Sequence, residues 1–497
     1  MSILFTDGTF YSMNREGETF GSVLVENGYI KEVFPKNAAP AWNGKTVSME
    51  DTAVFPGFID THTHSFSGGV ALTGIDLGNA KTVGEVLSLL SAGDPSKLGF
   101  ILGWRFDERQ VAERRFPTLA ELDAVQPNHP VVLRRVDGHS CAMNSKALKA
   151  VPWKGKKPKA HRLTGQHNYQ GITYFHDRID SDGIIEAYRN AAGAARKAGL
   201  TAVHTMIGDG KKDEAHYRLI ADRKGEFEVD FILYPQITDL RKCLELGADR
   251  LGGCILADGS FGSRTAALYE PYSDNPGYRG TPYRSDRFWR NLVGRANKSG
   301  LRCVVHAIGD RAAGQVTEAC LESSQKTGFR GNIIIHNELL NDSLIRSQAK
   351  SGIISVMQPL FDRLWGGTDG FYASILGEER ALRCNRLRSL TDAGITVTGS
   401  SDWYITGLDV LAGLHAGVNI HNPAERLSVF QSLTLYTANA ESIEDTTDGT
   451  SGRKLGKLLP GYRADFCCFD KDPFKDNDFR SIIIGKMFRK GEEVICG

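Results

Sequence analysis

The 497-residue sequence lacks several features that would place a chain in a class at once. No apolar run approaches the roughly 20 residues that a helix needs to cross a bilayer. The first residues have neither the basic lead nor the long apolar core of a secretory signal. The formal net charge is only +1, from 60 Lys and Arg against 59 Asp and Glu, so no excess of one sign favours a nucleic acid or an anionic membrane as partner. We therefore expect a cytoplasmic protein that binds neither.

The sequence also lacks a cysteine framework. Its nine cysteines are scattered and contain no Cys-x-x-Cys pair. Cys467 and Cys468 are adjacent in an expected strand, where successive side chains point to opposite faces. This pattern excludes a disulfide scaffold and agrees with a reducing compartment.

Both ends of the chain read as short strands. Residues 22–30 contain Asn27-Gly28, a pair that suits a two-residue hairpin turn, and residues 463–469 and 486–494 read as a strand and a hairpin. We expect residues 1–53 and 453–497 to form one small composite β-sandwich domain.

The middle of the chain alternates helices with buried strands. Glycines end several expected helices, and each is followed by a β-branched run. Eight strands are expected, near residues 54–60, 201–206, 229–235, 253–258, 302–306, 332–336, 353–358 and 395–400. This is the pattern of an α/β protein with a distorted (β/α)8 TIM barrel, whose first strand lies in 54–66 and whose remainder spans 191–452.

A long insertion separates the first two barrel strands. Residues 67–190 far exceed an ordinary crossover and include an expected strand at 131–136. We expect an inserted lid subdomain over the mouth of the barrel.

Metal-ligand side chains follow the expected strands. His62 and His64 are two positions apart on a strand and therefore point the same way, so that two imidazoles can hold one cation. Other polar groups that end or follow strands are His204, residues 254–258, His306, His336, Gln358 and Asp402. Because metal-ligand side chains end several independent strands, the sequence predicts a metal site at the carboxyl ends of the barrel strands.

Several motifs resemble the amidohydrolase superfamily, and within it the YtcJ-like branch that includes N-substituted formamide deformylases. They are PGFIDTHTH at 56–64, DGSFGSRTAAL at 258–268, HAIGDRA at 306–312, GSSD at 399–402, LTLYTANA at 433–440 and GKLLPGYRAD at 456–465. The resemblance implies that His62, His64, His306 and His336 bind one or two divalent ions, with Zn²⁺ favoured by the ligand set. It also implies that Asp402 is both ligand and proton shuttle in the hydrolysis of a non-peptide C–N bond, in an amide, a formamide or a cyclic amide.

Cys254 departs from the pattern of this superfamily, because many members carry a metal-bridging lysine there. A thiolate is a good zinc ligand, and a free cysteine is also a common buried apolar residue, so both roles stay open. If Cys254 does not ligate, one ion on His62, His64 and Asp402 is expected, with His306 and His336 left for substrate or a weak second ion.

Five further residues are candidates for substrate contact. Arg264 can clamp a carboxylate or carbonyl, Asp310 can orient a substrate donor, and His139 in the insertion can donate to an oxyanion; Trp104 and Gln358 are expected to line the site. Three of them have a plain structural alternative: an internal ion pair for Arg264, a helix cap for Asp310 and a surface position for His139. For His204 a structural role is favoured over ligation.

The same barrel also supports an isomerase or a decarboxylase, and a catalytically silent regulatory relative is a further alternative. The expected partner is a small-molecule substrate, and a homodimer is the default assembly.

Overall fold

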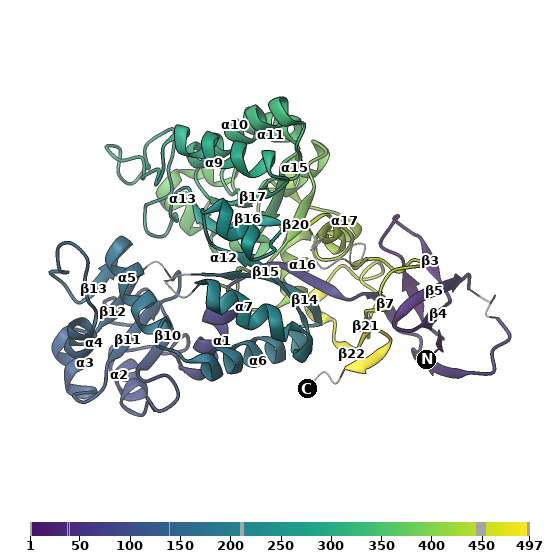
Figure 1. The fold of residues 1–497 in the computed structure, drawn as a ribbon, viewed down its shortest axis with the longest axis horizontal. Coiled ribbons are helices and arrows are strands. Elements are labelled where there is room, and N and C mark those ends of the chain that lie inside the picture. Colours follow the sequence, from purple (N-terminus) through teal and green to yellow (C-terminus); the bar gives the residue numbers. More distant parts are fainter. Residues whose placement is uncertain are drawn as a thin grey trace.

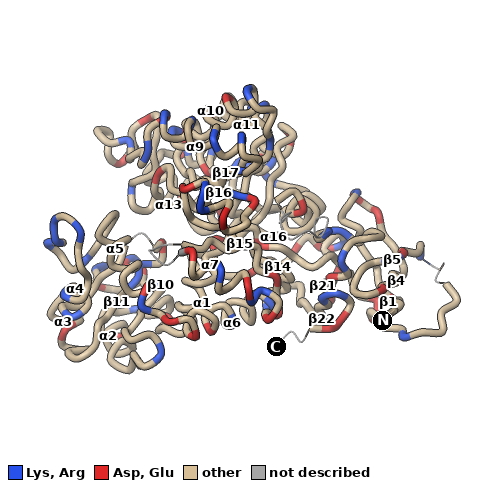
Figure 2. Tube along the Cα trace, in the orientation of Figure 1, with Lys and Arg blue, Asp and Glu red and all other residues tan. Residues whose placement is uncertain are grey.

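The computed structural model of this chain describes residues 2–36, 38, 40–138, 140–208, 213–443 and 454–494. The strands that alternate with helices form the centre of the molecule (Figure 1). Sheets from both chain ends lie on one side of this centre, and the insertion lies on the other. No helix in the described ranges is long and apolar enough to span a membrane. Acidic and basic residues are mixed in every part of the trace (Figure 2).

Two sheets are built from the ends of the chain. The first has the order β5-β4-β1-β6, with β1 (Ser2–Thr6), β4 (Ser22–Glu26), β5 (Tyr29–Phe34) and β6 (Lys45–Ser48). The second has the order β23-β22-β21-β7-β2-β3, with β2 (Thr9–Tyr11), β3 (Thr19–Phe20), β7 (Ala53–Pro56), β21 (Phe466–Phe469), β22 (Ile484–Arg489) and β23 (Glu492–Val494). Because β7 pairs with both β2 and β21, residues from the two termini share one sheet. The expected boundary at 452/453 lies outside the described residues.

Local sequence explains two details of these sheets. Asn27 and Gly28 both have positive φ, 52° and 83°, and they join β4 to β5 as the predicted hairpin. The adjacent Cys467 and Cys468 belong to different hydrophobic cores, as strand alternation predicts.

Eight strands of the described chain form the central parallel sheets. They are β8 (Phe58–Thr63), β14 (Leu200–Ile207), β15 (Asp230–Pro235), β16 (Arg250–Leu256), β17 (Arg302–Ala307), β18 (Ile333–His336), β19 (Ile354–Met357) and β20 (Val397–Gly399). All eight expected strands are present within a few residues of their predicted positions. The sequence missed one break: the segment near 54–60 is divided at Gly57 between β7 and β8.

These strands do not close into one continuous sheet. Their orders are β15-β14-β8 and β16-β17-β18-β19-β20. At one seam, the Thr61 hydroxyl donates to the carbonyl of Gly399 at 2.8 Å, so a side chain occupies an acceptor that a neighbouring strand would otherwise use. The other seam lies between β15 and β16, and β16 itself is irregular, since its pairing with β17 shifts register between Gly252 and Ile255. The fold is therefore TIM-barrel-like, with the sheet interrupted at two places.

Helices follow the central strands. They are α7 (Asp213–Arg223), α8 (Leu240–Glu245), α9 (Asp286–Lys298), α10 (Asp310–Thr327), α11 (Asp342–Ser351), α12 (Pro359–Trp365), α13 (Phe371–Leu376), α14 (Glu378–Ala381), α15 (Leu387–Asp392), α16 (Val410–Val418) and α17 (Val429–Leu435).

The insertion has a sheet of its own. Its order is β13-β12-β11-β10-β9, from β9 (Ile75–Asp76), β10 (Ile101–Phe106), β11 (Val131–Arg135), β12 (Ser140–Met143) and β13 (Arg162–Thr164). The surrounding helices are α1 (Ser65–Thr73), α2 (Val83–Ser91), α3 (Leu119–Val125), α4 (Ser145–Ala150), α5 (Gly165–His176) and α6 (Ser181–Lys197). One face of β11 contributes Val131 and Leu133 to the insertion's own core, whereas Val132 joins the large core that also contains Tyr404 of the barrel.

Candidate metal centre

The predicted ligands converge at the carboxyl ends of the central strands. Nε2 of His62 and Nε2 of His64 lie 3.0 and 3.3 Å from the same Asp402 oxygen, Oδ1. Ligand atoms of these three residues all lie within 4.8 Å of one another. His62 and His64 come from β8, and Asp402 follows β20, so the strand order brings together residues 340 positions apart.

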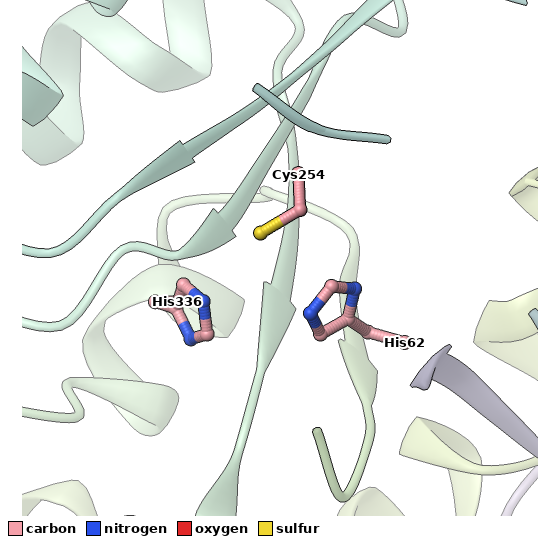
Figure 3. Close-up of side chains that lie close together, drawn as sticks. All are labelled: His62, Cys254 and His336. Atoms are coloured by element: carbon pink, nitrogen blue, oxygen red, sulfur yellow. The ribbon is translucent and has the colours of Figure 1, made fainter. Parts of the chain in front are cut away.

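A second group of ligand atoms shares His62. Its ring, the Cys254 sulfur and His336 also place ligand atoms within 4.8 Å of one another. In Figure 3 the sulfur of Cys254 points toward the space between the two imidazoles. Cys254 lies on β16 and His336 ends β18. The position at which the sequence departs from many superfamily members therefore faces the candidate site.

The polar atoms of the site fit a cation. Both ring nitrogens of His62 and Oδ1 of Asp402 are buried, and apart from the close approach of the two β8 imidazoles to Oδ1 they have no hydrogen-bond partner among the described residues. Buried polar atoms usually have such partners. Imidazole, thiolate and carboxylate are the ligand types that zinc and other transition metals prefer.

Protonation states agree with ligation. Burial lowers the pKa of His62, and it lowers the pKa of His336 to about 4, so both imidazoles are neutral at pH 7. Burial alone would raise the pKa of Asp402, but the adjacent His62 and His64 hold it well below its usual range. Neutral imidazole and ionised carboxylate are the forms that bind metal.

Two of these residues hold the backbone in the left-handed region. His336 has φ of 70° and Asp402 has φ of 55°. Residues other than glycine uncommonly adopt this conformation, and such strain is concentrated at functional sites.

Asp60 forms hydrogen bonds to the backbone on both sides of the site, at His62 and at Ser401. Its buried carboxylate accepts the backbone N–H of His62 at 3.1 Å and that of Ser401 at 3.1 and 3.2 Å. Despite these bonds, burial raises its pKa to about 7. The position of this aspartate two residues before His62 is visible in the sequence. Its hydrogen bond to Ser401 is not, because it forms only where β8 lies beside the loop after β20.

His306 lies beside the two groups. Its ring centroid is 4.4 Å from that of His336, its Nδ1 is 3.5 Å from the Cys254 sulfur, and its Nε2 donates to the carbonyl of Gly259 at 3.1 Å. This donor leaves Nδ1 as the acceptor atom on the side of Cys254. In the described structure, His306 is not a member of either three-residue group.

Asp258 supports the loop next to His306. Its buried carboxylate accepts backbone N–H groups of Ala267, Ile308 and Gly309 at 2.8 to 3.0 Å. Burial nonetheless raises its pKa to about 7. The DGS motif therefore fixes the loops after β16 and β17, a role that the sequence analysis did not assign.

The residues predicted to contact substrate differ in their burial and in their partners within the protein. Arg264 forms an ion pair with Asp274 at 2.6 Å, and the Asp310 carboxylate accepts the N–H of Tyr269 at 3.0 Å. Trp104 is buried in the core that joins the insertion to the barrel. Gln358 is also buried, and its Oε1 lies 2.8 Å from Nδ1 of His336. His139 lies outside the described residues.

His204 belongs to the interior of the barrel. Its Nδ1 is 2.7 Å from the hydroxyl of Tyr234 on the next strand, and the side chain is fully buried. This contact agrees with the structural role that was favoured for it.

Comparisons with known proteins find amidohydrolases and other hydrolases by sequence and by structure. Residues 45–478 match the model of an amidohydrolase family, which is more than four-fifths of the chain. YtcJ of Bacillus subtilis (strain 168) is 27% identical over 95% of each chain, and the N-substituted formamide deformylase of Arthrobacter pascens is 24% identical over 91% of this chain and 90% of its own. The crystal structure of an uncharacterized metal-dependent hydrolase from Pyrococcus furiosus is 25% identical, with a TM-score of 0.78, and covers 95% of this chain and 100% of the other. The chain belongs to the amidohydrolase family.

Proposed function

We propose that this protein is a metal-dependent hydrolase that cleaves a non-peptide C–N bond, in an amide, an N-substituted formamide or a cyclic amide. The observation that carries the proposal is the convergence of His62, His64 and Asp402 at the strand ends, with Cys254 and His336 beside them. The formamide class is supported by the similarity to the Arthrobacter deformylase.

His62, His64 and Asp402 hold a divalent ion in this proposal, with Zn²⁺ the expected ion, and Cys254 and His336 complete the same centre or hold a second ion. Such an ion supplies Lewis acidity, which acidifies a water molecule and polarises the substrate carbonyl.

Asp402 is the proposed proton carrier. Its carboxylate is ionised, nearly buried and directed toward both imidazoles of β8. It accepts a proton from the attacking water and returns it to the departing nitrogen, as a general base and then a general acid. The buried neutral imidazoles of His62 and His336 cannot compete for that proton at pH 7.

A substrate panel tests this proposal. Protein loaded with Zn²⁺ is incubated with N-benzylformamide, dihydrouracil, N-acetylated amines and dipeptides, and the released acid and amine are quantified. Release from at least one non-peptide amide is expected. It should fall about 10²- to 10⁴-fold in Asp402→Asn but not in Asp392→Asn, a control on the exposed face of α15.

Two results would contradict the proposal. Cleavage of dipeptides alone would place the enzyme in another substrate class. Loss of CO2 or rearrangement without release of acid and amine would favour the decarboxylase or isomerase alternative.

A further inference from the structure

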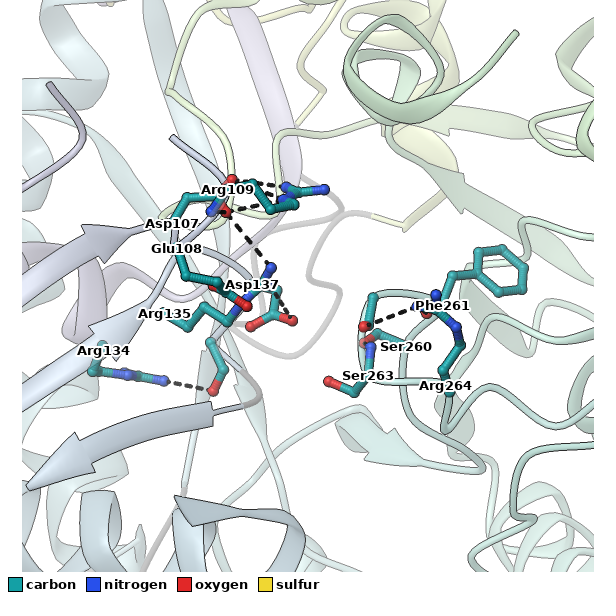
Figure 4. A network of polar contacts seen from close by, with 12 residues as sticks. Asp107, Glu108, Arg109, Arg134, Arg135, Asp137, Ser260, Phe261, Ser263 and Arg264 are labelled. Atoms are coloured by element: carbon teal, nitrogen blue, oxygen red, sulfur yellow. Dashed lines mark hydrogen bonds and ion pairs between the residues drawn. The ribbon is translucent and has the colours of Figure 1, made fainter. Parts of the chain in front are cut away.

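Two adjacent arginines at the end of β11 differ sharply in their surroundings. Arg135 faces three carboxylates, with Asp137 and Glu108 each at 2.8 Å and Asp107 at 3.7 Å (Figure 4). Arg134 forms no ion pair with any described residue, although only 8% of it is exposed, and its Nε is buried without a hydrogen-bond partner there. A buried charge without a counter-charge is costly, so its retention needs an explanation.

The protein contacts of Arg134 do not neutralise it. One Nη2 group donates to the carbonyl of Gly138 at 3.3 Å, and the guanidinium carbon lies 4.9 Å from the ring centre of Tyr404. A guanidinium has five N–H donors, so most of its donor capacity remains. Stacking on an aromatic ring orients the fork and leaves its positive charge in place.

Arg134 packs against the loop that carries Asp402, because its guanidinium lies over the ring of Tyr404. Tyr404 is two residues beyond Asp402, and the N–H of Ile405 donates to the Asp402 carbonyl at 2.8 Å. A Cβ at Gly138 would lie 3.1 Å from Ile405 and 3.4 Å from the Tyr404 hydroxyl. The turn after β11 therefore packs directly on the loop that carries Asp402.

The same turn also approaches the opposite loop of the barrel. A Cβ at Gly262 would lie 3.2 Å from the Asp137 carboxylate, and Figure 4 shows the acidic and basic residues of the insertion facing the loop of Ser260 and Ser263. Gly259 of this loop accepts from His306. The insertion thus contacts the loop of Asp402 and the loop of Gly259, and Arg134 belongs to the part that packs on the Asp402 loop.

A second buried polar group lies beside Arg134. Nδ2 of Asn168 donates to the same Gly138 carbonyl at 3.2 Å, and its Oδ1 is buried without a partner among the described residues. A cationic donor and a neutral acceptor are thus held next to each other. The arginine can bind a carboxylate and the asparagine oxygen can accept a neighbouring N–H group of the same ligand.

We propose that Arg134 binds a carboxylate of the substrate, so that the enzyme acts on N-acyl compounds that carry an acid group next to the scissile amide. Asn168 accepts the amide N–H of the same molecule. This inference rests on the proposed function, because it names the substrate class of that site. Arg134 is a specificity residue, and the hydrolytic step itself does not require it.

A matched pair of compounds tests the inference. N-formylphenylalanine and N-formyl-2-phenylethylamine differ only in the carboxylate. The Zn²⁺-loaded protein should hydrolyse the acid with a kcat/KM about 10- to 100-fold above that of the neutral compound. Arg134→Met should remove this preference and leave the neutral compound within about threefold. Arg134→Lys, which keeps the charge but not the fork, should retain part of it.

The control is Arg178→Met, because the exposed Arg178 also stacks on a tyrosine, Tyr174, at 3.3 Å. It should leave the preference unchanged. Equal losses for both compounds in Arg134→Met would overturn the inference. So would equal rates of the unmodified protein on both compounds, a result that does not depend on the folding of any variant.

Calorimetric titration separates this inference from the proposed function. If neither compound is hydrolysed, the acid should still bind at least about 10-fold more tightly than the neutral compound, and Arg134→Met should abolish the difference. Equal affinities would reject the carboxylate site, whatever the catalytic result.

Discussion

Nδ1 of His336 lies 2.8 Å from Oε1 of Gln358, and the amide nitrogen of Gln358 donates to the Ser400 hydroxyl at 2.9 Å. The second bond orients the amide so that its oxygen faces the imidazole. Nδ1 of His336 must then carry the proton, and Nε2 is left as the lone-pair donor. Gln358 thus fixes the tautomer and direction of a candidate ligand.

Replacement of this glutamine should weaken metal binding. Loss of such a supporting hydrogen bond typically costs 10- to 100-fold in metal affinity, so Gln358→Leu should lower Zn²⁺ affinity by about that factor. Competition with a chromogenic chelator measures it. Gln315→Leu on α10 is the control, because that buried glutamine bonds to Asp286 away from the centre; equal affinities of all three proteins would refute the role of Gln358.

Cys254 should contribute a thiolate ligand. Protein reconstituted with Co²⁺ is expected to show thiolate-to-cobalt charge-transfer absorption in the near ultraviolet, and Cys254→Ser should lose it. The reason is the position of the sulfur beside His62 and His336. Cys384→Ser, at a buried cysteine in another core, should retain the band. A spectrum that is unchanged in Cys254→Ser would leave this residue a packing role only.

Asp258 should matter for stability. The Asp258 carboxylate accepts three backbone N–H groups. In Asp258→Asn an NH2 group replaces one carboxylate oxygen, so that a donor faces backbone N–H donors there. We expect a loss of about 2–4 kcal/mol in the free energy of unfolding, visible as a lower midpoint in urea. Asp274→Asn breaks only the partly exposed ion pair with Arg264 and should cost less than about 1 kcal/mol. Similar midpoints for the two variants would contradict the assigned role.

His176 should make the fold sensitive to acid. Burial, with smaller effects of Arg134 and His216, lowers its pKa to about 3, below the value of about 6.5 in an unfolded chain. The unfolded state therefore binds more protons between these values. The stability contribution is complete above pH 6.5 and is lost as the pH falls toward 3.

The comparison variant is His176→Leu, which has no titrating group there. Between pH 7.5 and pH 5 the unmodified protein should lose about 2 kcal/mol more unfolding free energy than this variant. The exposed His129→Leu should behave like the unmodified protein. Parallel losses in the unmodified protein and His176→Leu would show that His176 does not carry this sensitivity.

Much of the fold follows from local patterns. Buried β-branched runs, several of them after glycines, located the eight central strands, and Asn27-Gly28 located a hairpin, because these signals act over a few residues. The interruption between β8 and β20 and the register shift of β16 could not be foreseen, since they depend on how Thr61 meets Gly399 and how β16 pairs with β17.

The candidate site also contains residues that could be predicted from the sequence and residues that could not. The His-x-His spacing and Asp402 were visible because strand alternation and motif resemblance point to them directly. The support by Asp60 and Gln358, the pairing of Arg264 with Asp274, and the lack of an ion-pair partner for Arg134 within the described chain are set by contacts between distant segments. No pattern along the chain encodes those contacts.

The most direct test of the account is the metal content of the purified protein after reconstitution, measured by plasma mass spectrometry beside His62→Ala. His62 belongs to both groups of ligand atoms, so its loss should affect either arrangement. We predict at least one equivalent of a divalent transition metal in the unmodified protein and a large loss in His62→Ala. Absence of metal from the unmodified protein, or equal metal content in the two proteins, would contradict the central claim.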